Sequence, residues 1–380
     1  MHASKPPTFQ RHAVHLTTVH QRYDIRIFRK ECCSLARSGW MVTLIVADGK
    51  RDETVSGVQI VDAGRSRSRL SRMLFGSLRV LRLALRMDGH IYHFHDPELI
   101  PAALILAWFG KSVIYDAHED VSRQILTKPW LPRWVRRPVS AVFESLENFA
   151  VRRFSAAIGA TPHIADRLCQ LNSLSIAINN FPLRDEIESP EPNTPRMTTR
   201  DRVACYVGGI TRIRGAIEMV SAMEHVDGRL ILAGPIEDAA LERELRALPG
   251  WSKVDYRGVV SRESVRKIFS ESRLGLLPLL PAPNHFTAQP NKMFEYMSAG
   301  LPVIASDFPL WRCILGQHNS GILVPAGDVT ALAAAIQELL DQPERCQDMG
   351  IRGLELVSTS HNWDAEQSKL IELYSRFGST

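Results

Sequence analysis

Continuous apolar runs alternate with amphipathic segments along the first half of the chain. Residues 41–47 (MVTLIVA) form one such run, and residues 91–95 and 112–119 contribute two more. A run without polar alternation is typical of a strand that is covered on both faces of a parallel sheet. The pattern predicts strands at 12–19, 41–47, 58–64, 91–95, 112–119 and 156–161, with helices at 25–38, 71–87 and 138–154.

The same pattern begins again after a segment rich in proline and charge. Residues 182–201 hold four prolines, a composition typical of a linker between domains. After it, strands are predicted at 203–207, 230–233, 254–256, 274–278, 303–306 and 321–324, a helix capped by Asp328 at 329–340, and a last helix at about 363–377.

Two α/β domains follow from this repetition. The predicted boundaries are an N-terminal domain at 1–182, a linker at 183–201, a C-terminal domain at 202–357 and a C-terminal helix at 358–380 that crosses back to the N-terminal domain. Each domain is expected to be Rossmann-like and doubly wound, and the two are expected to face a cleft. Ligands of such sheets bind at the carboxyl ends of the strands.

Composition and charge narrow the class of protein. Of 380 residues, 45% are hydrophobic and 23% charged, as in ordinary globular proteins. Residues 1–185 carry 26 Lys and Arg against 16 Asp and Glu, whereas residues 186–380 carry 20 against 25, so the first half is expected to face something anionic. Six cysteines without metal spacing and the lack of an apolar leader or long apolar span indicate a cytoplasmic protein.

A glycine-rich turn follows the strand at 203–207. Gly208 and Gly209 allow close approach of the backbone to a ligand, and Arg212 and Arg214 stand just before a helix, whose free N–H groups favour anions. A diphosphate would suit this loop, although a glycine turn with two solvated arginines is an equally good interpretation. No Gly-Lys-Ser/Thr follows, so it is not a Walker A loop.

Residues 289–307 place polar groups close to a buried strand. The carboxylate of Glu295 can accept two hydrogen bonds from a ribose diol, while Asn291, Lys292 and the N–H groups near Met293 can hold phosphate and sugar oxygens. A surface helix with a solvated glutamate is the alternative. The apolar neighbours of Glu295 favour a functional partner.

Arg257 ends another strand of the second domain. With Gly258 it could present backbone groups to the edge of a nucleobase. A plain turn, followed by Ser261 as a helix cap, explains the segment equally well.

Three segments of the second half resemble the family 4 glycosyltransferases (the group 1 family): GGITRIRG (208–215), PNKMFEYMSAGLPVIASD (290–307) and SGILVPAGDVTALAAAI (320–336). Residues 19–48, 93–105 and 110–120 resemble the acceptor-side domain of that family, in its bacterial surface-polysaccharide branch. The resemblance implies the GT-B fold and retaining transfer from a nucleotide-diphosphate sugar to a lipid-linked glycan. It implies neither a cofactor nor an obligatory metal.

The resemblance also assigns roles to single residues. Glu295 matches the second acid of the E-x7-E motif, on the ribose, and Thr287 stands where the first acid contacts the transferred sugar. Arg214 takes the place of a lysine against the diphosphate, and Gly209 that of a further basic residue, which Arg212 is proposed to replace.

In the first domain, the resemblance places His118 near the donor sugar. Arg26 stands where the family has a Gly-Gly loop and is expected to contact phosphate or acceptor. Asp96 and Glu119, at the ends of their strands, are expected to contact substrate.

For the reaction itself, the departing diphosphate needs cations or N–H groups. Arg212, Arg214 and Lys292 are the candidates for this catalytic role.

Three other interpretations rank lower. Residues 93–96 (HFHD), with His118 and Glu119, resemble a zinc cluster, but His93 and His95 simply alternate across one strand, and no metal is expected. A sugar-nucleotide epimerase could use the same fold, and so could a non-catalytic binding protein.

Two basic segments interleaved with apolar residues suggest contact with an anionic membrane. Residues 65–87 hold seven arginines among leucine, methionine and phenylalanine, and residues 128–138 add Trp130 and Trp134. The location expected is peripheral, on the inner face of the cell membrane. A helix with one face in the core and a solvated basic face is the alternative. Nucleic acid is not expected, because no aromatic strand platform accompanies the charge.

Overall fold

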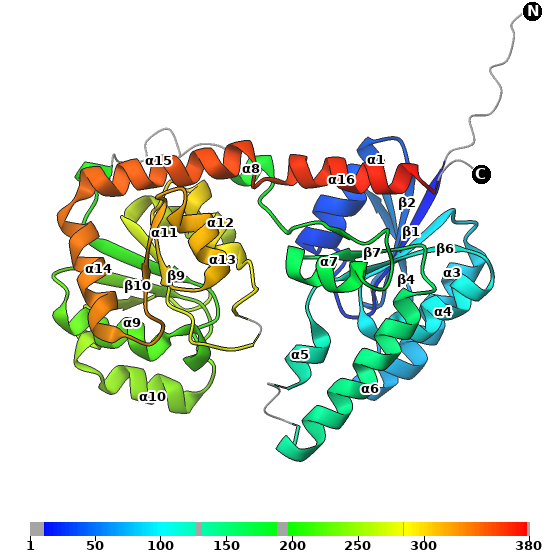
Figure 1. Cartoon of the computed structure of the whole chain (residues 1–380), viewed down its shortest axis with the longest axis horizontal. Coiled ribbons are helices and arrows are strands. Elements are labelled where there is room, and N and C mark those ends of the chain that lie inside the picture. Colours follow the sequence, from blue (N-terminus) through cyan, green and yellow to red (C-terminus); the bar gives the residue numbers. More distant parts are fainter. Residues whose placement is uncertain (1–10, 127–130, 188–196, 284, 378–380) are drawn as a thin grey trace, which may run out of the picture. The chain divides into compact units, whose positions relative to one another are not determined.

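The computed structural model describes residues 11–126, 131–187, 197–283 and 285–377, and the chain divides into two compact units. Unit 1 consists of Met1–Asn180 and Trp363–Thr380, and unit 2 of Phe181–Asn362. Figure 1 shows that each unit is a sheet with helices on its faces. The chain leaves unit 1 after Asn180 and re-enters it at Trp363. Residues 188–196 of the predicted linker lie outside the described residues.

Unit 1 contains an eight-stranded sheet in the order β3-β4-β2-β1-β5-β6-β7-β8. Every pair of neighbours is parallel except β3 and β4. The strands are β1 (His12–Leu16), β2 (Met41–Val46), β3 (Glu53–Val55), β4 (Val58–Asp62), β5 (Ile91–Phe94), β6 (Ser112–Ala117), β7 (Ala156–Gly159) and β8 (Ile176–Ala177). The six predicted strands are confirmed. The other two, β3 and β8, have three and two residues and are too short to show a periodicity.

Helices cover both faces of this sheet. They are η1 (Ile25–Cys32), α1 (Cys33–Arg37), α2 (Arg69–Ser71), η2 (Arg72–Gly76), α3 (Ser77–Arg86), η3 (Pro97–Leu99), α4 (Ile100–Trp108), α5 (Val121–Ile125), α6 (Arg133–Val151), α7 (Pro162–Cys169) and α16 (Trp363–Ser375). The prediction that a helix starts near Pro138 was wrong, because α6 begins five residues earlier and tolerates the proline inside it. The predicted helix at 25–38 starts with a π-helical turn, η1, whose first N–H groups are capped by Asp24.

Unit 2 contains six parallel strands in the order β11-β10-β9-β12-β13-β14. They are β9 (Val203–Val207), β10 (Arg229–Ala233), β11 (Val254–Tyr256), β12 (Leu274–Leu277), β13 (Val303–Ser306) and β14 (Gly321–Val324), which confirms all six predictions to within one residue. The helices are α8 (Arg184–Ile187), η4 (Met197–Thr199), η5 (Arg212–Arg214), α9 (Ala216–Ala222), η6 (Met223–His225), α10 (Ala239–Ala247), η7 (Pro249–Lys253), α11 (Arg262–Glu271), α12 (Asn291–Ser298), α13 (Pro309–Trp311), η8 (Arg312–Gly316), α14 (Val329–Asp341) and α15 (Pro343–Thr359). Asp328 caps α14 as predicted, with its Oδ1 accepting from the N–H of Ala331 at 2.9 Å.

In each sheet the strand order reverses at the first strand of the unit. β1 lies between β2 and β5, and β9 lies between β10 and β12. At such a switch point the two following connections leave toward opposite faces, so the carboxyl ends of the strands open a crevice for ligands. The residues that follow β1, β5 and β6 in unit 1, and β9 and β12 in unit 2, are therefore those placed for function.

The C-terminal helix α16 packs into unit 1. Trp363 is fully buried there, and its Nε1 donates to the hydroxyl of Ser34 at 2.9 Å. Glu366 is buried as well and accepts from the backbone N–H of Asn179 at 2.9 Å. A tryptophan of this kind contributes a large apolar area and a buried hydrogen bond at once.

We expect the change Trp363→Ala to lower the free energy of unfolding by about 3–5 kcal/mol, because it leaves a cavity and an unpaired hydroxyl. Urea denaturation followed by circular dichroism measures it. Trp134→Ala is the matched control, since that side chain is 81% exposed, and it should change stability by less than about 0.5 kcal/mol. Equal effects of the two changes would show that α16 does not stabilise unit 1.

Candidate functional site

The loop after β9 is built so that a cation can lie directly on its backbone. Gly208 has a φ of 137°, a conformation that favours glycine, and its N–H donates to the carbonyl of Ala233 at 2.6 Å. A Cβ at Gly208 would lie 2.1 Å from Nζ of Lys292. The ammonium of Lys292 therefore packs against the bare main chain of the loop, which only a glycine allows.

Lys292 lies in the first turn of α12 and is poorly hydrated. Burial lowers the pKa of its ammonium, although the charge of Glu295 opposes the shift and Arg214 adds to it. Among the described residues, this ammonium has no carboxylate partner and no hydrogen-bond acceptor, and its nearest aromatic contact is the ring of Tyr206, at 5.9 Å from the centroid. A desolvated cation without a counter-ion is costly. An anion bound beside it would remove that cost.

A second cation lies over the next glycine. Nη1 of Arg214 donates to the carbonyl of Gly209 at 3.3 Å, and a Cβ at Gly209 would lie 2.7 Å from the same nitrogen. Arg214 is held there by Gly215, whose φ is 77° and whose Cβ would meet the carbonyl of Pro278 at 2.2 Å. Lys292 and Arg214 thus flank two consecutive glycines. This arrangement can hold two phosphate groups in a row.

Arg212, predicted to share the catalytic role, is directed elsewhere. Its Nη2 lies 2.5 Å from Oε2 of Glu244 on α10, and its backbone N–H donates to Glu237 at 3.1 Å. The correction has a local cause, because η5 places successive side chains around a tight turn and Glu244 on α10 pairs with the first arginine. Only Arg214 of the pair remains at the glycines.

The other site residues predicted in α12 and in the loop before it differ in how far they are exposed. Glu295 stands one turn after Lys292, is about one-third exposed, and lies 3.6 Å from Nη1 of Arg262. Asn291 is exposed and Thr287 partly buried. Met293 is a correction: its side chain is fully buried and its N–H donates to the carbonyl of Pro290 at 3.0 Å, so neither is available to a ligand.

Arg257 also differs from the expectation. Its guanidinium lies between Asp255 and Glu271, at 2.9 Å from a carboxylate oxygen of each. Its backbone N–H donates to the carbonyl of Leu232 within the sheet. The segment therefore matches the plain turn, and the N-cap role of Ser261 is confirmed by its hydrogen bond from the N–H of Ser264.

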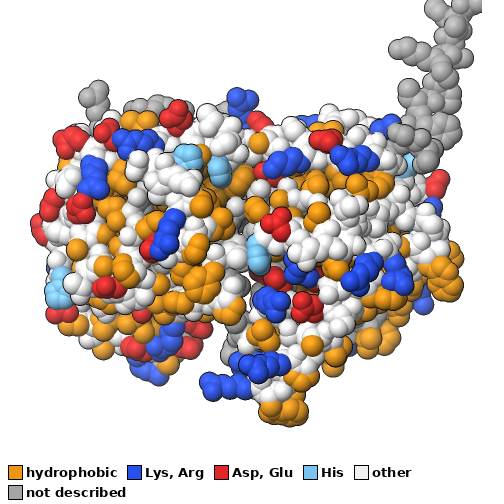
Figure 2. All heavy atoms as spheres, viewed as in Figure 1, with side chains coloured by type: hydrophobic (Ala, Val, Ile, Leu, Met, Phe, Trp, Pro, Cys, Tyr) orange, Lys and Arg blue, Asp and Glu red, His pale blue; other side chains and the backbone are white. Residues whose placement is uncertain are grey.

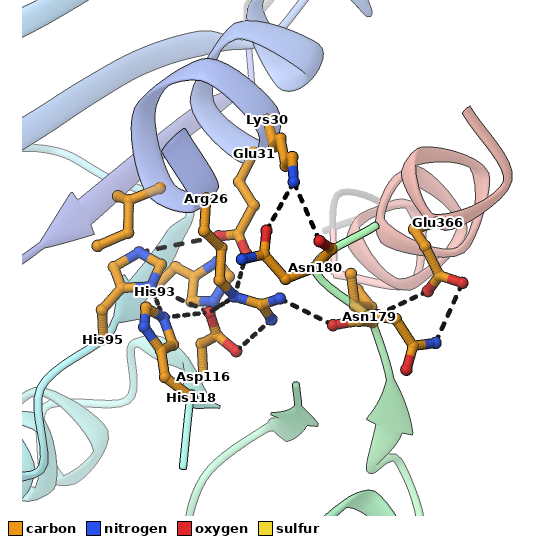
Figure 3. Close-up of polar contacts among 12 residues, drawn as sticks. Arg26, Lys30, Glu31, His93, His95, Asp116, His118, Asn179, Asn180 and Glu366 are labelled. Atoms are coloured by element: carbon orange, nitrogen blue, oxygen red, sulfur yellow. Dashed lines mark hydrogen bonds and ion pairs between the residues drawn. The ribbon is translucent and has the colours of Figure 1, made fainter. Parts of the chain in front are cut away.

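In unit 1, His118 is held by a buried carboxylate. Nε2 of His118 lies 2.8 Å from Oδ2 of Asp116, the polar residue inside β6, and 3.3 Å from Nδ1 of His95. Figure 3 shows the three side chains converging. Burial opposes the ionisation of Asp116, yet Arg26 and His118 hold the pKa of this carboxyl well below its ordinary value. The carboxylate is thus charged and fixes the ring of His118.

Arg26 does not face solvent, contrary to its predicted contact with phosphate or acceptor. It is 5% exposed, its Nη2 lies 2.7 Å from Oδ1 of Asp116, and its Nη1 donates to the carbonyl of Ile178 at 2.9 Å. The π-helical turn of η1 carries this side chain inward, across the end of β6. Arg26 acts on His118 only through Asp116.

Asp96 and Glu119 are placed differently from each other. Asp96 is buried, and its Oδ2 accepts from the hydroxyl of Thr17 at 2.8 Å and from the backbone N–H of Val19 at 3.1 Å. It therefore organises the loop that follows β1, which corrects the expected substrate contact. Glu119 is exposed and accepts from the amide of Gln124.

The comparisons with known proteins agree with this arrangement. Residues 201–342 match the family model described as glycosyl transferases group 1, and residues 26–174 match the glycosyl transferase 4-like domain.

The chain belongs to the group 1 glycosyltransferase family.

Its relatives among characterised proteins are distant. It is 23% identical over 251 residues to the alpha-D-kanosaminyltransferase of Streptomyces kanamyceticus, a match covering 61% of this chain and 63% of that protein. It is 37% identical over 82 residues to the phosphatidyl-myo-inositol mannosyltransferase of Mycobacterium leprae, covering 22% of each. The chain thus covers less than two thirds of the length of either relative.

Solved structures match over nearly the whole chain. The sucrose-phosphate synthase of Thermosynechococcus elongatus has a TM-score of 0.76 at 17% identity, with 97% of this chain and 98% of that one covered. Anabaena HepE, solved with UDP and glucose, has a TM-score of 0.72 at 13% identity, with 97% and 100% covered. The predicted GT-B architecture of two Rossmann-like domains is confirmed.

We expect the change Gly208→Ala to weaken binding of pyrophosphate at least ~10-fold, a loss of about 1.4 kcal/mol, because the new Cβ displaces the ammonium of Lys292. Isothermal titration calorimetry measures it. Gly110→Ala is the control, since Gly110 also has a positive φ, 74°, but its Cβ would meet nothing within 4 Å. Unchanged pyrophosphate affinity in Gly208→Ala would exclude the loop as the anion site.

Proposed function

We propose that this protein is a glycosyltransferase that moves a sugar from a nucleotide-diphosphate sugar to an acceptor with retention of the anomeric configuration. The observation that carries the proposal is the pair of cations on Gly208 and Gly209. Lys292 is desolvated and has no acidic partner among the described residues, and Arg214 lies beside it. Two cations on exposed main chain are suited to the diphosphate of such a donor.

The same pair would perform the chemical step. Cleavage of the sugar–phosphate bond develops negative charge on the departing diphosphate, and fixed cations stabilise that charge more in the transition state than in the bound donor. Arg214 supplies a forked set of donors and Lys292 a point charge. We propose that these groups do this work in place of a divalent metal at the diphosphate.

Glu295 is proposed to bind the ribose of the donor. It lies on the same helix as Lys292, one turn further on, so a nucleotide whose phosphates contact Lys292 would bring its ribose to this carboxylate. Asn291 and Thr287 would then contact sugar oxygens. HepE, which shares the fold, was solved in complexes with UDP and with UDP-glucose, which supports a nucleotide-sugar donor, with a hexose or an N-acetylhexosamine as the transferred group.

His118 is proposed to act on the transferred sugar through its Nδ1. Its Nε2 is occupied by Asp116, and among the described residues no hydrogen-bond partner faces its Nδ1. The side chain is 18% exposed, so this nitrogen can meet a ligand while the ring stays fixed by the carboxylate behind it.

The changes Arg214→Ala and Lys292→Ala should each reduce sugar transfer by about 10²–10³-fold while the protein stays folded. Release of nucleoside diphosphate from a panel of sugar nucleotides, with and without acceptor extract, measures it. Arg212→Ala is the matched control, because its guanidinium is paired with Glu244, and it should keep most of the activity.

Full turnover by Lys292→Ala would remove the phosphate role. Conversion of the donor sugar without any acceptor would instead indicate an epimerase.

The acceptor is proposed to be a glycan linked to a lipid, reached from an anionic membrane surface. Three neighbouring helical segments of unit 1 expose large apolar side chains: η2 with α3, then α4, then α6, with α3 packed on α4 and α4 on α6. Among these side chains Trp108 is 87% exposed and Phe75 61%. The exposed apolar residues are Leu70, Met73, Leu74, Phe75, Leu78, Leu85, Ile105, Trp108, Phe109, Trp134, Val139, Val142, Leu146 and Phe149.

Basic side chains share this three-helix surface. Arg65, Arg67, Arg69, Arg82, Arg86, Arg133 and Arg137 are exposed. Figure 2 shows hydrophobic and basic side chains together on the part of unit 1 that holds these helices. α3 does turn one face to the core through Val80, Leu81 and Ala84, but its outer face is apolar as well as basic, as expected of a helix at a lipid interface.

The second basic segment is described in part, because Trp130 and the rest of 127–130 lie outside the described residues. In the part of the chain that is described, no helix has both the length and the apolar character to cross a bilayer. The contact that we propose is peripheral.

The wild-type protein should float with vesicles containing anionic lipid at low salt, but not with neutral vesicles, and the double change Phe75→Glu with Trp108→Glu should abolish flotation. Val259→Glu is the control, because Val259 is 78% exposed on unit 2. Sedimentation of the wild type away from anionic vesicles at low salt would defeat the membrane contact.

A further inference from the structure

A second cluster of polar side chains lies deep in unit 1, behind Asp116 and His118. His15 on β1 pairs in register with His93 on β5, and His95 follows on the same face of β5. Glu31, from η1, lies over these rings, as Figure 3 shows for Glu31, His93 and His95. His15, His93 and Glu31 are fully buried, and His95 is 2% exposed. A carboxylate and three imidazoles at such depth require partners.

The donor atoms of the cluster converge on one point. One nitrogen or oxygen of each of the four side chains lies within 4.8 Å of those of the others. Nδ1 of His15 lies 3.0 Å from Nε2 of His95, and Oε2 of Glu31 lies 4.0 and 3.9 Å from these two nitrogens. In a four-coordinate zinc site with bonds of about 2.1 Å, neighbouring donors stand about 3.4 Å apart. The three distances within the cluster, 3.0, 3.9 and 4.0 Å, lie on either side of that value.

The outer nitrogen of every imidazole is already hydrogen-bonded. The hydroxyl of Tyr374 lies 2.8 Å from Nδ1 of His93 and 3.1 Å from Nε2 of His15. Nδ1 of His95 lies 3.2 Å from Oδ2 of Asp116. Metal-binding histidines have this arrangement, in which the second nitrogen bonds to a carboxylate or another fixed group and sets the orientation of the ring.

The inner atoms, in contrast, have few partners. Nδ1 of His15 and Nε2 of His95 bond to each other at 3.0 Å. Within the described residues, Nε2 of His93 and both oxygens of Glu31 have no hydrogen-bond partner. Nε of Arg26 lies 3.2 Å from Oε1 of Glu31, but the same guanidinium is bonded to Asp116. One cation therefore faces two buried carboxylates.

We propose that His15, Glu31, His93 and His95 bind a divalent transition-metal ion, of which zinc suits the ligands best. Three imidazoles and one carboxylate are ligands that zinc prefers, and the ion would occupy the point on which their inner donor atoms converge. With no exposed ligand, the ion would be structural, tying η1 to β1 and β5. The site is separate from the cations that are proposed to hold the diphosphate in unit 2.

Metal analysis of the full-length protein tests this inference. Protein made with zinc in the medium, purified without a histidine tag or chelator, should contain about one equivalent of zinc per chain by mass spectrometry of the elements. Removal of the ion should lower the midpoint of thermal unfolding, and added Zn²⁺ or Co²⁺ should restore it. Bound Co²⁺ should show the visible absorption of a tetrahedral site.

Variants locate the ion. Glu31→Gln and His93→Gln should each lose the bound zinc, whereas His225→Gln, at an exposed histidine of unit 2, should retain it. If a variant does not fold, the zinc content and the Co²⁺ spectrum of the wild-type protein still test the metal site. Wild-type protein with less than about one tenth of an equivalent of metal, and no thermal shift on adding Zn²⁺ or Co²⁺, would overturn the site. Equal zinc in all three variants would overturn it too.

Discussion

The contact between the ammonium of Lys292 and the main chain of Gly208 constrains both the residue type and the conformation of the loop that follows β9 in unit 2. Any side chain at position 208 would occupy the place of the ammonium, so this position must be glycine. The φ of that glycine is 137°, and its carbonyl lies so close to the neighbouring strand end that a Cβ on Gly234 would meet it at 2.0 Å. The glycine conformation of the loop thus allows the close contact that fixes the position of the ammonium. A positive charge held so near the backbone is suited to an anionic ligand.

Unit 1 differs from unit 2 in that it buries histidines and carboxylates at the ends of its strands. At the carboxyl ends of β1, β5 and β6 it gathers histidines and carboxylates, and the guanidinium of Arg26 pairs with both Glu31 and Asp116. Asp116 takes two of its hydrogen bonds and in turn holds His118. Because a buried charge is stable only with its partners in place, the loss of Arg26 would disturb the ring of His118 without touching any ligand. The positions of the functional side chains in both units therefore depend on groups behind them.

Much of the fold was predictable, because buried parallel strands leave long apolar runs in the sequence. The six strands of unit 2 and the cap at Asp328 were found from that pattern and from local capping chemistry. The two short strands of unit 1 were not predicted, since two or three residues show no periodicity. The start of α6 was not predicted either, because Pro138 was interpreted as the first residue of the helix. Local propensity disfavours a proline inside a helix, so it did not predict the residues of α6 that precede Pro138.

The site was predictable where chemistry is local and not where it depends on distant partners. Gly208, Gly209, Arg214 and Lys292 were recognised from strand ends and turn residues. The capture of Arg212 by Glu244, thirty-two positions away, and the inward turn of Arg26 toward Asp116 could not be read from spacing. Asp116 itself was missed as a site residue, although a lone acid inside a largely apolar strand, two positions before His118, was the available signal.

A crystal structure of the chain with a nucleoside diphosphate tests the central claim most directly. The account predicts diphosphate oxygens within about 3.2 Å of both Nζ of Lys292 and the guanidinium of Arg214, above the two glycines. A diphosphate bound elsewhere on the protein, with the ammonium of Lys292 still facing only Gly208 and Tyr206, would contradict it.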